Sequence, residues 1–316
     1  MSSINTNVAA NSALQALTMT QKDMVQTQAR ISTGYRVANA QDNAAYWSIA
    51  TTMRSDSAAL SAVKDALGLG SATADVAYTG VNNSIKLLDQ IKQKLVAARE
   101  PGVDRTKIQS DIKALQDQLQ STSDTASFSG QNWLKIDTTA GTDIVKQIVS
   151  SFARDSTNAV TVGTISVTLY NATTGASVGL FDLNTTASAK AGLLDKQQTA
   201  ASGANYTVAS LDISALTDSA VDLTDLDSYI TTVDATISKL TGSATTLGSV
   251  KSRIDMQKSF VSDLMGAVDT GVSLLVDADM NEESTKLQAL QTKQSLGVQS
   301  LSIANQSSQA ILKLFQ

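Results

Sequence analysis

The fold of this chain is decided by residues 8–31, which read VAANSALQALTMTQKDMVQTQARI. Apolar residues in this stretch recur at alternating steps of three and four, which places them along one side of a helix. Gln21 and Gln28 complete the stripe at the two positions where an apolar residue is missing. The seam predicted at this end of the chain consists of Ala10, Leu14, Leu17, Met24 and Ile31.

The other end of the chain carries a matching stripe, with Gln294, Gly297 and Ser308 as its weak positions. A lone helix with one apolar stripe is marginal in water, because nucleation is costly and nothing covers the stripe. The two ends therefore need each other or copies of themselves, which indicates an assembling structural protein. The alternative is an ordinary helix packed on its own domain. The C-terminal seam consists of Leu287, Leu290, Leu301, Ala304, Ile311 and Phe315.

Composition favours long packed helices over a compact enzyme core. The 316 residues are 42% hydrophobic but only 4% aromatic, with one proline, no cysteine and no histidine. The net charge of −5 argues against a nucleic-acid partner, which requires basic patches. The absence of cysteine fits either chance or a protein exported unfolded to an oxidising exterior. We expect no cleaved leader at residues 1–17 and no membrane span, because no segment approaches about 20 apolar residues.

Three further helices are predicted between the ends. The first covers residues 43–100 and is stopped by Pro101-Gly102, and the second covers residues 103–127. A third seam keeps one heptad register from Leu226 to Leu275, which is a strong coiled-coil signal. The two halves of the sequence should fold back on each other as an antiparallel bundle.

The middle of the chain has a different sequence pattern. Residues 161–170 alternate like a β-strand, residues 171–175 read as a turn, and residues 178–183 read as the return strand. This pattern predicts a small domain inserted into the bundle. The fold class is therefore mainly α: a long antiparallel coiled-coil bundle of the N- and C-terminal parts, with a small inserted α+β outer domain.

Few residues suggest a chemical site. Tyr46 and Trp47 are interpreted as packing groups, because they enter a helix beside alanines. Asp277 and Asp279 could belong to a cation site, but they lack the glycine and ligand pattern of a calcium loop, so a charged helix junction is favoured. The other carboxylates are scattered over polar helix faces, so no pair of them is a candidate general acid and base. No catalytic residue, metal or cofactor is expected.

The sequence resembles bacterial flagellin at both ends. Residues 30–37, RISTGYRV, and residues 40–45, AQDNAA, look like the N-terminal signature of that family. At the other end LGSV (247–250), DAD (277–279), ANQ (304–306) and ILKLF (311–315) agree in order and spacing. The resemblance covers roughly residues 1–135 and 225–316. Residues 42–50 are similar to flagellins of the alphaproteobacterial, rhizobial type.

This resemblance implies a structural subunit that self-assembles into the helical filament of the flagellum, an extracellular propeller for swimming. It implies export as an unfolded chain through the flagellar type III apparatus with an export chaperone, and hook-associated junction and cap proteins as partners. The polymer could be homogeneous or mixed with other flagellins. The alternatives are a hook–filament junction protein and a secreted surface adhesin.

The resemblance also implies a layered domain organisation. Residues 1–35 and 285–316 would form an inner coiled-coil domain around a central channel. Residues 36–140 and 226–284 would form the surrounding helical bundle, and residues 141–225 a small variable outer domain. Some flagellins carry an inserted metallopeptidase with histidine ligands, which this histidine-free chain excludes.

The plant-receptor epitope of the family corresponds to residues 29–50. Gln41 stands where the recognised pattern has lysine, Asn43 replaces aspartate, and Tyr46 and Trp47 add bulk, so we expect weak recognition. Residues 89–98 also lack the arginine-rich pattern read by the mammalian receptor, so poor recognition is expected there too. The epitope-like positions are Arg30, Gly34, Arg36, Asp42 and Asn43.

Overall fold

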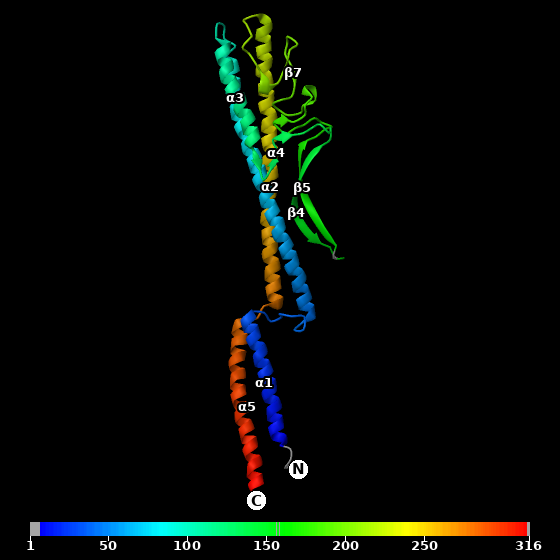
Figure 1. The fold of residues 1–316 in the computed structure, drawn as a ribbon, viewed down its shortest axis with the longest axis vertical. Helices are drawn as coiled ribbons and strands as arrows, with labels where there is room; N and C mark the ends of the chain where they lie inside the picture. Colours follow the sequence, from blue (N-terminus) through cyan, green and yellow to red (C-terminus); the bar gives the residue numbers. More distant parts are fainter. Residues whose placement is uncertain (1–6, 156, 158, 315–316) are drawn as a thin grey trace. The chain divides into compact units, whose positions relative to one another are not determined.

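A computed structural model describes residues 7–155, 157 and 159–314, with the side chains of residues 307–314 excepted. The chain folds as two compact units, one of residues 1–58 and 264–316 and one of residues 59–263. Helices account for most of both (Figure 1). The helices are α1 (Val8–Thr33), α2 (Ala44–Ala97), α3 (Arg105–Thr125), α4 (Ala220–Val276) and α5 (Met280–Leu314).

In the unit of residues 59–263, α2 and α4 run antiparallel along each other. Asp75 pairs with Lys251, and Lys92 pairs with Asp234. The step forward along α2 from one pair to the next equals the step back along α4. The predicted antiparallel bundle is thus confirmed, and its surface carries the ion pairs.

The apolar stripes predicted from three-and-four spacing form the core of this bundle. Many residues on the apolar stripes of α2, α3 and α4 have no measurable solvent exposure, because the three helices turn these faces toward one another. Other stripe residues, such as Ile85, Leu115 and Ile237, are only half-buried. Burial of this apolar area is the main stabilising contribution. The fully buried members include Leu67, Val81, Leu88, Ile91, Leu95, Ile112, Leu119, Leu226, Val233, Leu240, Leu247 and Ile254.

One buried arginine, which the sequence did not single out, joins the α2–α3 turn to the start of α4. Arg105 donates from Nε to the carbonyl of Ala98 at 3.0 Å and from Nη1 to the carbonyl of Leu216 at 3.2 Å. It also pairs with Asp218 at 2.6 Å. The planar guanidinium can satisfy all three acceptors at once, so it fixes segments far apart in sequence.

The segment between α3 and α4 is built from short strands, an 11-residue hairpin pair and two single-turn 3-10 helices, η1 (Ala187–Ala189) and η2 (Val208–Ser210). The strand pairs are β1–β2, β4–β5 and β7–β8, all antiparallel, and β3–β6, which is parallel. The strands are β1 (Ser127–Phe128), β2 (Gln131–Asn132), β3 (Lys135–Ile136), β4 (Ile144–Arg154), β5 (Val160–Tyr170), β6 (Phe181–Asp182), β7 (Gln198–Thr199) and β8 (Asn205–Tyr206).

The predicted return strand at residues 178–183 is wrong. The predicted strand exists as β5, but it pairs with β4, upstream in sequence. The turn at Asn171 to Gly175 does form, yet it leads only to an isolated bridge between Tyr170 and Ser177. The following segment is held by β3 instead, where a Cβ on Gly179 would lie 2.6 Å from Ile136 Cγ2.

Two buried carboxylates organise the turn between β6 and β7. Asp182 accepts hydrogen bonds from the Thr138 side chain and from the backbone N–H groups of Thr138, Asn184 and Ala191. Burial acts to raise the pKa of Asp182, but these hydrogen bonds together hold it below its usual value. Burial dominates at Asp195 and raises its pKa, although Lys190 lies 3.1 Å away.

Among the described helices, α4 alone is long and apolar enough, by length and composition, to cross a membrane. An 18-residue window of it has a mean hydropathy of 1.3, and 17% of that window is buried. The expectation that no segment approaches such a span is therefore wrong by this criterion. The ion pairs of α4 with α2, Lys92–Asp234 and Lys251–Asp75, argue for a helix packed in protein, because a bilayer core disfavours charge.

Two glycines of α2 provide a matched test of this packing. A Cβ on Gly80 would lie 2.5 Å from Leu134 Cδ1 and 3.3 Å from Ala126 Cβ, whereas one on Gly68 would meet nothing within 4 Å. We expect Gly80→Ala to destabilise the protein by about 1–3 kcal/mol through overpacking. Gly68→Ala should stabilise it by up to about 1 kcal/mol through helix propensity. Guanidinium unfolding followed by circular dichroism measures both, and a stabilised Gly80→Ala variant would contradict the described packing.

Candidate assembly surface

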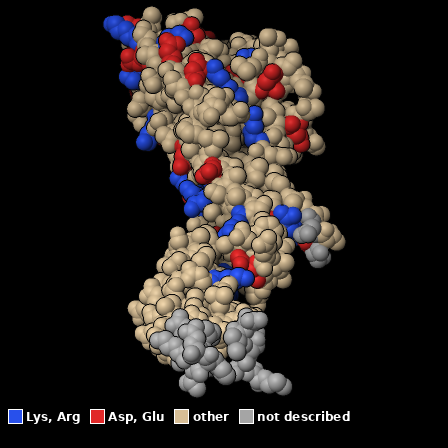
Figure 2. Space-filling model, turned by 60° about the horizontal axis from the view of Figure 1, so that its bottom comes forward, with Lys and Arg blue, Asp and Glu red and all other residues tan. Residues whose placement is uncertain are grey.

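Helices α1 and α5, named here the terminal pair, lie antiparallel and carry very few charges. Residues 8–29 contain only Lys22 and Asp23, and residues 287–312 contain only Lys293. The face of this pair seen in Figure 2 is accordingly almost without blue or red. Asparagine, glutamine, serine and threonine supply its polarity. Uncharged polar groups cost less to remove from water than charges, so this surface is suited to being covered by protein.

The face that α1 turns toward α5 differs from the predicted seam at every second position. Leu17, Met24 and Ile31 are buried or half-buried as expected. Between them the inward positions belong to Ala13, Thr20 and Thr27, whereas Leu14, Gln21 and Gln28 are exposed. Both sets keep three-and-four spacing, so the sequence pattern could not choose between them. Ala13, Thr20 and Thr27 have small side chains, so the two helices can approach each other closely. Leu14 then lies on the neighbouring face, where it is 51% exposed.

The α5 side of this contact uses a glycine as a close-approach position. Leu290 is buried, and Leu287, Leu301 and Ala304 are half-buried. A Cβ on Gly297 would lie 3.0 Å from Leu17 Cδ1, so this apparently weak position makes room for Leu17. Two predicted seam residues remain untested, because the Ile311 side chain and the whole of Phe315 lie outside the described residues.

Polar contacts fix the register of the terminal pair. Gln294 donates to Gln21 at 2.8 Å, and Arg30 pairs with Glu283 at 3.0 Å. Glu283 is buried, and its Oε2 has no hydrogen-bond partner. The single ion pair is therefore the main compensation for burying that carboxylate. Arg30 was predicted only as an epitope-like position, and the structure gives it this second role.

Large hydrophobic side chains stay exposed mainly in the unit of residues 1–58 and 264–316. This unit holds about a third of the chain but thirteen of the 24 such side chains among the described residues. An accumulation of exposed apolar side chains in one unit is typical of surfaces that bind other proteins. On the terminal pair the exposed residues are Val8, Leu14, Met19, Val25, Met280, Leu296, Val298 and Ile303.

The turns after α1 and after α4 are fastened to each other, forming what we call the joint (residues 34–43 and 277–279). Gly34 ends α1 with a φ of 75°, a left-handed conformation that suits glycine. Its carbonyl accepts from the Ala278 N–H at 2.9 Å, and Tyr35 forms a β-bridge with Asp277. Arg36 donates from Nη2 to the Leu275 carbonyl at 3.0 Å.

The joint is closed by two short polar residues. Asp42 Oδ2 accepts from the N–H groups of Ala38 and Asn39, both at 3.0 Å. Asn43 Oδ1 accepts from two N–H groups in the first turn of α2, which makes it the N-cap of that helix. Beneath these turns lies a small apolar cluster of Val37, Ala50, Val272 and Val276. All five epitope-like positions therefore have local structural roles.

The acidic group at the start of α5 is a helix junction, as favoured from sequence. Asp279 Oδ1 accepts from the Asn281 N–H at 2.8 Å and the Glu282 N–H at 3.3 Å, so it caps α5. Within the described residues no group of three or more acidic, histidine or cysteine side chains could hold a metal ion. These carboxylates serve the helix end and the Arg30 pair.

The interpretation of Tyr46 and Trp47 as packing groups is wrong for the chain by itself. Tyr46 is 41% exposed and Trp47 is 39% exposed. Both lie within one turn of Ala50, yet neither ring belongs to the apolar cluster of the joint. Exposed aromatic rings are typical of protein interfaces.

Comparison with known proteins identifies the family of this chain, whose two ends form the charge-poor terminal pair. The profile described as "bacterial flagellin N-terminal helical region" matches residues 4–139, and "bacterial flagellin C-terminal helical region" matches residues 230–315. The chain is 48% identical to flagellin C of Rhizobium meliloti (strain 1021) over 324 aligned positions, and 43% identical to a flagellin of Brucella melitensis over 317. Both alignments cover 100% of each chain.

A second Rhizobium meliloti relative shows that the family varies in length. Flagellin D is 41% identical over 396 aligned positions covering 100% of both chains, so it carries residues that this 316-residue chain lacks. Both profile matches and these full-length identities agree with the predicted resemblance. The chain belongs to the flagellin family, of the rhizobial type, and is a structural subunit of the bacterial flagellar filament.

Proposed function

We propose that polymerisation is the event that covers the terminal pair. The inward face of α1 is built about half from alanine and threonine, and the outward faces of the pair expose Leu14, Val25 and Ile303. Neighbouring copies would remove this apolar area from water, at about 25 cal/mol per Å². Ordering of the ends and assembly would then be one process, as in segments that fold on binding. The charge-poor surface of the terminal pair is the observation that carries this proposal.

We further propose the layered organisation implied by the resemblance. Residues 1–35 and 285–316 would line the inner tube, residues 36–140 and 226–284 would surround it, and residues 141–225 would project outward. The low number of charges on the terminal pair supports the inner position, and the surface ion pairs of α2 with α4 suit a layer that meets water. A filament reconstruction that placed the terminal pair outside would overturn this arrangement.

We infer that the chain acts outside the cell, without enzymatic activity. Export unfolded through the flagellar type III apparatus, with an export chaperone, suits a cysteine-free chain. Growth would occur beneath a cap protein and beyond hook-associated junction proteins, in a homopolymer or with other flagellins. Detection of the chain in sheared flagella, and its loss from the medium of an export-deficient strain, would test this localisation.

Two other functions predict different experimental results. A hook–filament junction protein would share the terminal helices but would stop growth, whereas a filament subunit seeded with filament fragments elongates without limit. An adhesin would depend on the inserted segment and not on the terminal pair. The exposed apolar surface on the terminal pair favours the filament subunit over the adhesin, and the full-length similarity to flagellins favours it over the junction protein.

Leu14 offers the sharpest test of the proposed role of the terminal pair. It is exposed and directed away from α5, so Leu14→Lys should leave monomer helicity unchanged. Because a lysine would have to be desolvated in the polymer, seeded elongation should slow at least about tenfold. Gln15→Lys, also at an exposed position, controls for the added charge. Elongation of Leu14→Lys at the parent rate, measured by light scattering, would refute burial of this position.

Recognition by plant receptors should be weak. Gln41 and Asn43 remove two charges from the expected pattern, and Tyr46 and Trp47 add bulk. A peptide of residues 29–50 should give little oxidative burst in plant tissue at nanomolar dose. A Gln41→Lys, Asn43→Asp peptide serves as the matched control and should be more active. A full burst from the unaltered peptide would show that these departures do not matter.

A further inference from the structure

The first turn of α2 carries two adjacent aromatic side chains, which we call the aromatic knob (Tyr46 and Trp47). Tyr46 is 41% exposed and Trp47 is 39% exposed. Arg54 lies seven residues after Trp47 and therefore on the same face of the helix, about 10.5 Å further along. The Arg54 guanidinium sits 4.9 Å from the ring centre of Tyr35, which holds this charge beside the knob.

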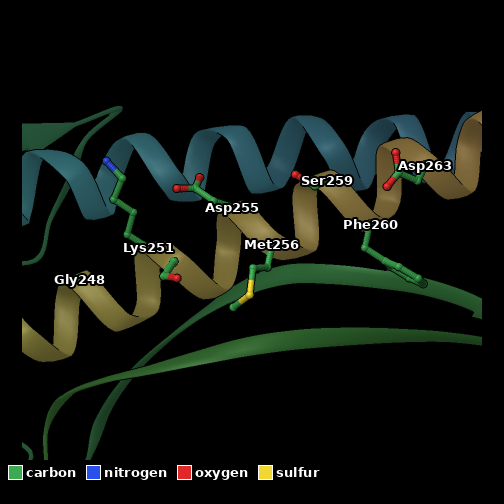
Figure 3. A pocket seen from close by; sticks show the side chains of 8 residues that line it. Gly248, Lys251, Asp255, Met256, Ser259, Phe260 and Asp263 are labelled. Atoms are coloured by element: carbon green, nitrogen blue, oxygen red, sulfur yellow. The ribbon is translucent and has the colours of Figure 1, made fainter.

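A receiving surface of matching chemistry lies on α4. A shallow groove of about 670 Å³ is lined entirely by α4 residues, with Met256 and Phe260 as its apolar part. These two side chains are 63% and 59% exposed. In Figure 3 they extend to the side of α4 that faces the β4–β5 hairpin strands, while Lys251 and Asp255 project toward α2. Asp263 closes the groove at its C-terminal end.

The knob and the groove agree in spacing and are opposite in charge. On α2 an apolar residue, Trp47, precedes a cation, Arg54, by seven residues. On α4 an apolar residue, Met256, precedes an anion, Asp263, also by seven residues. A helical rise of about 1.5 Å per residue makes both separations about 10.5 Å. When Trp47 lies over Met256 with the helices parallel, Arg54 meets Asp263.

We propose that the aromatic knob of one copy docks on the α4 groove of a different copy in the filament. This inference rests on the proposed function and names one contact that assembly would use. Knob and groove are different patches, so the contact is heterologous and each added copy presents the same unused pair again. Such contacts continue as an open helix unless the rotation closes, which is the symmetry a filament needs.

The alternative of a knob packing on a second knob is disfavoured by charge. It would bring Arg54 of one copy toward Arg54 of the other, and like charges at an interface are repulsive. A self-complementary contact would also close as a dimer and leave no site for growth. The acidic border of the groove offers the cation a favourable partner instead.

A charge exchange tests the pairing in the full-length chain. Arg54→Glu and Asp263→Arg should each slow seeded elongation at least about tenfold, because each places like charges together. The double variant Arg54→Glu/Asp263→Arg restores opposite charges and should elongate within about threefold of the parent. Lys107→Glu, at an 85% exposed side chain of α3, controls for charge reversal and should have no effect. A double variant as slow as the single variants would overturn the pairing.

Tryptophan fluorescence provides a measurement that is independent of these variants. Trp133 is buried and Trp47 is exposed, so iodide should quench mainly Trp47 in the monomer. Iodide quenching should fall when the parent chain polymerises. It should not change when the Trp47→Phe variant polymerises. Filaments in which Trp47 remains as quenchable as in the monomer would overturn this contact while leaving the proposed function intact. Failure of the parent chain to elongate from seeds would overturn both.

Discussion

The structure depends on one contact that leaves apolar side chains uncovered, the antiparallel packing of α1 on α5. Two helices can cover only one face of each other, and here about half of the α1 side of that contact is alanine and threonine. Large apolar residues such as Leu14 and Ile303 remain in water on the other faces, with almost no charge nearby. The charged surface that a solvated helix normally has is largely missing, although uncharged polar side chains are present. The terminal pair is thus built to be enclosed by other copies.

The bundle of α2, α3 and α4 shows the contrasting solution within the same chain. Three helices enclose a complete seam there, and residues such as Leu88 and Leu240 are fully buried without help from another copy. Lysine, arginine and aspartate cover its surface. Glycines permit the inserted segment to approach α2, as Gly80 does beneath Leu134. The two regions use the same heptad spacing. Three helices around the seam make the bundle core complete within one chain, whereas two helices leave the seam of the terminal pair open to other copies.

Sequence periodicity was sufficient for the helices, because a heptad seam sustained from Leu226 to Leu275 has few other interpretations. The family was indicated instead by the resemblance of the motifs at both ends of the chain. It could not choose between Leu14 and Ala13 as the inward position, since both obey the same spacing. It could not find β4, because strand pairing depends on a partner that local alternation does not name. Trp47 was misassigned for a related reason: an aromatic residue in a helix looks the same whether its partner is in the chain or in another copy.

The epitope-like residues illustrate how a site motif can arise from structural need. Gly34, Asp42 and Asn43 each satisfy a local backbone requirement at the joint, and Arg30 compensates a buried carboxylate. A receptor that reads these positions would be reading residues the joint requires for its own geometry. Gln41 is exposed and accessible to change without disturbing the joint.

Hydrogen–deuterium exchange of the dilute chain against seeded filaments measures the central claim most directly. In the monomer, amides of α1 and of α5 up to residue 306 should exchange orders of magnitude faster than those of α2 and α4 at the bundle core, because their helices lack a complete partner. In the filament, the same amides should become as protected as the bundle. Protection of both terminal helices in the monomer equal to that of the bundle would contradict the account.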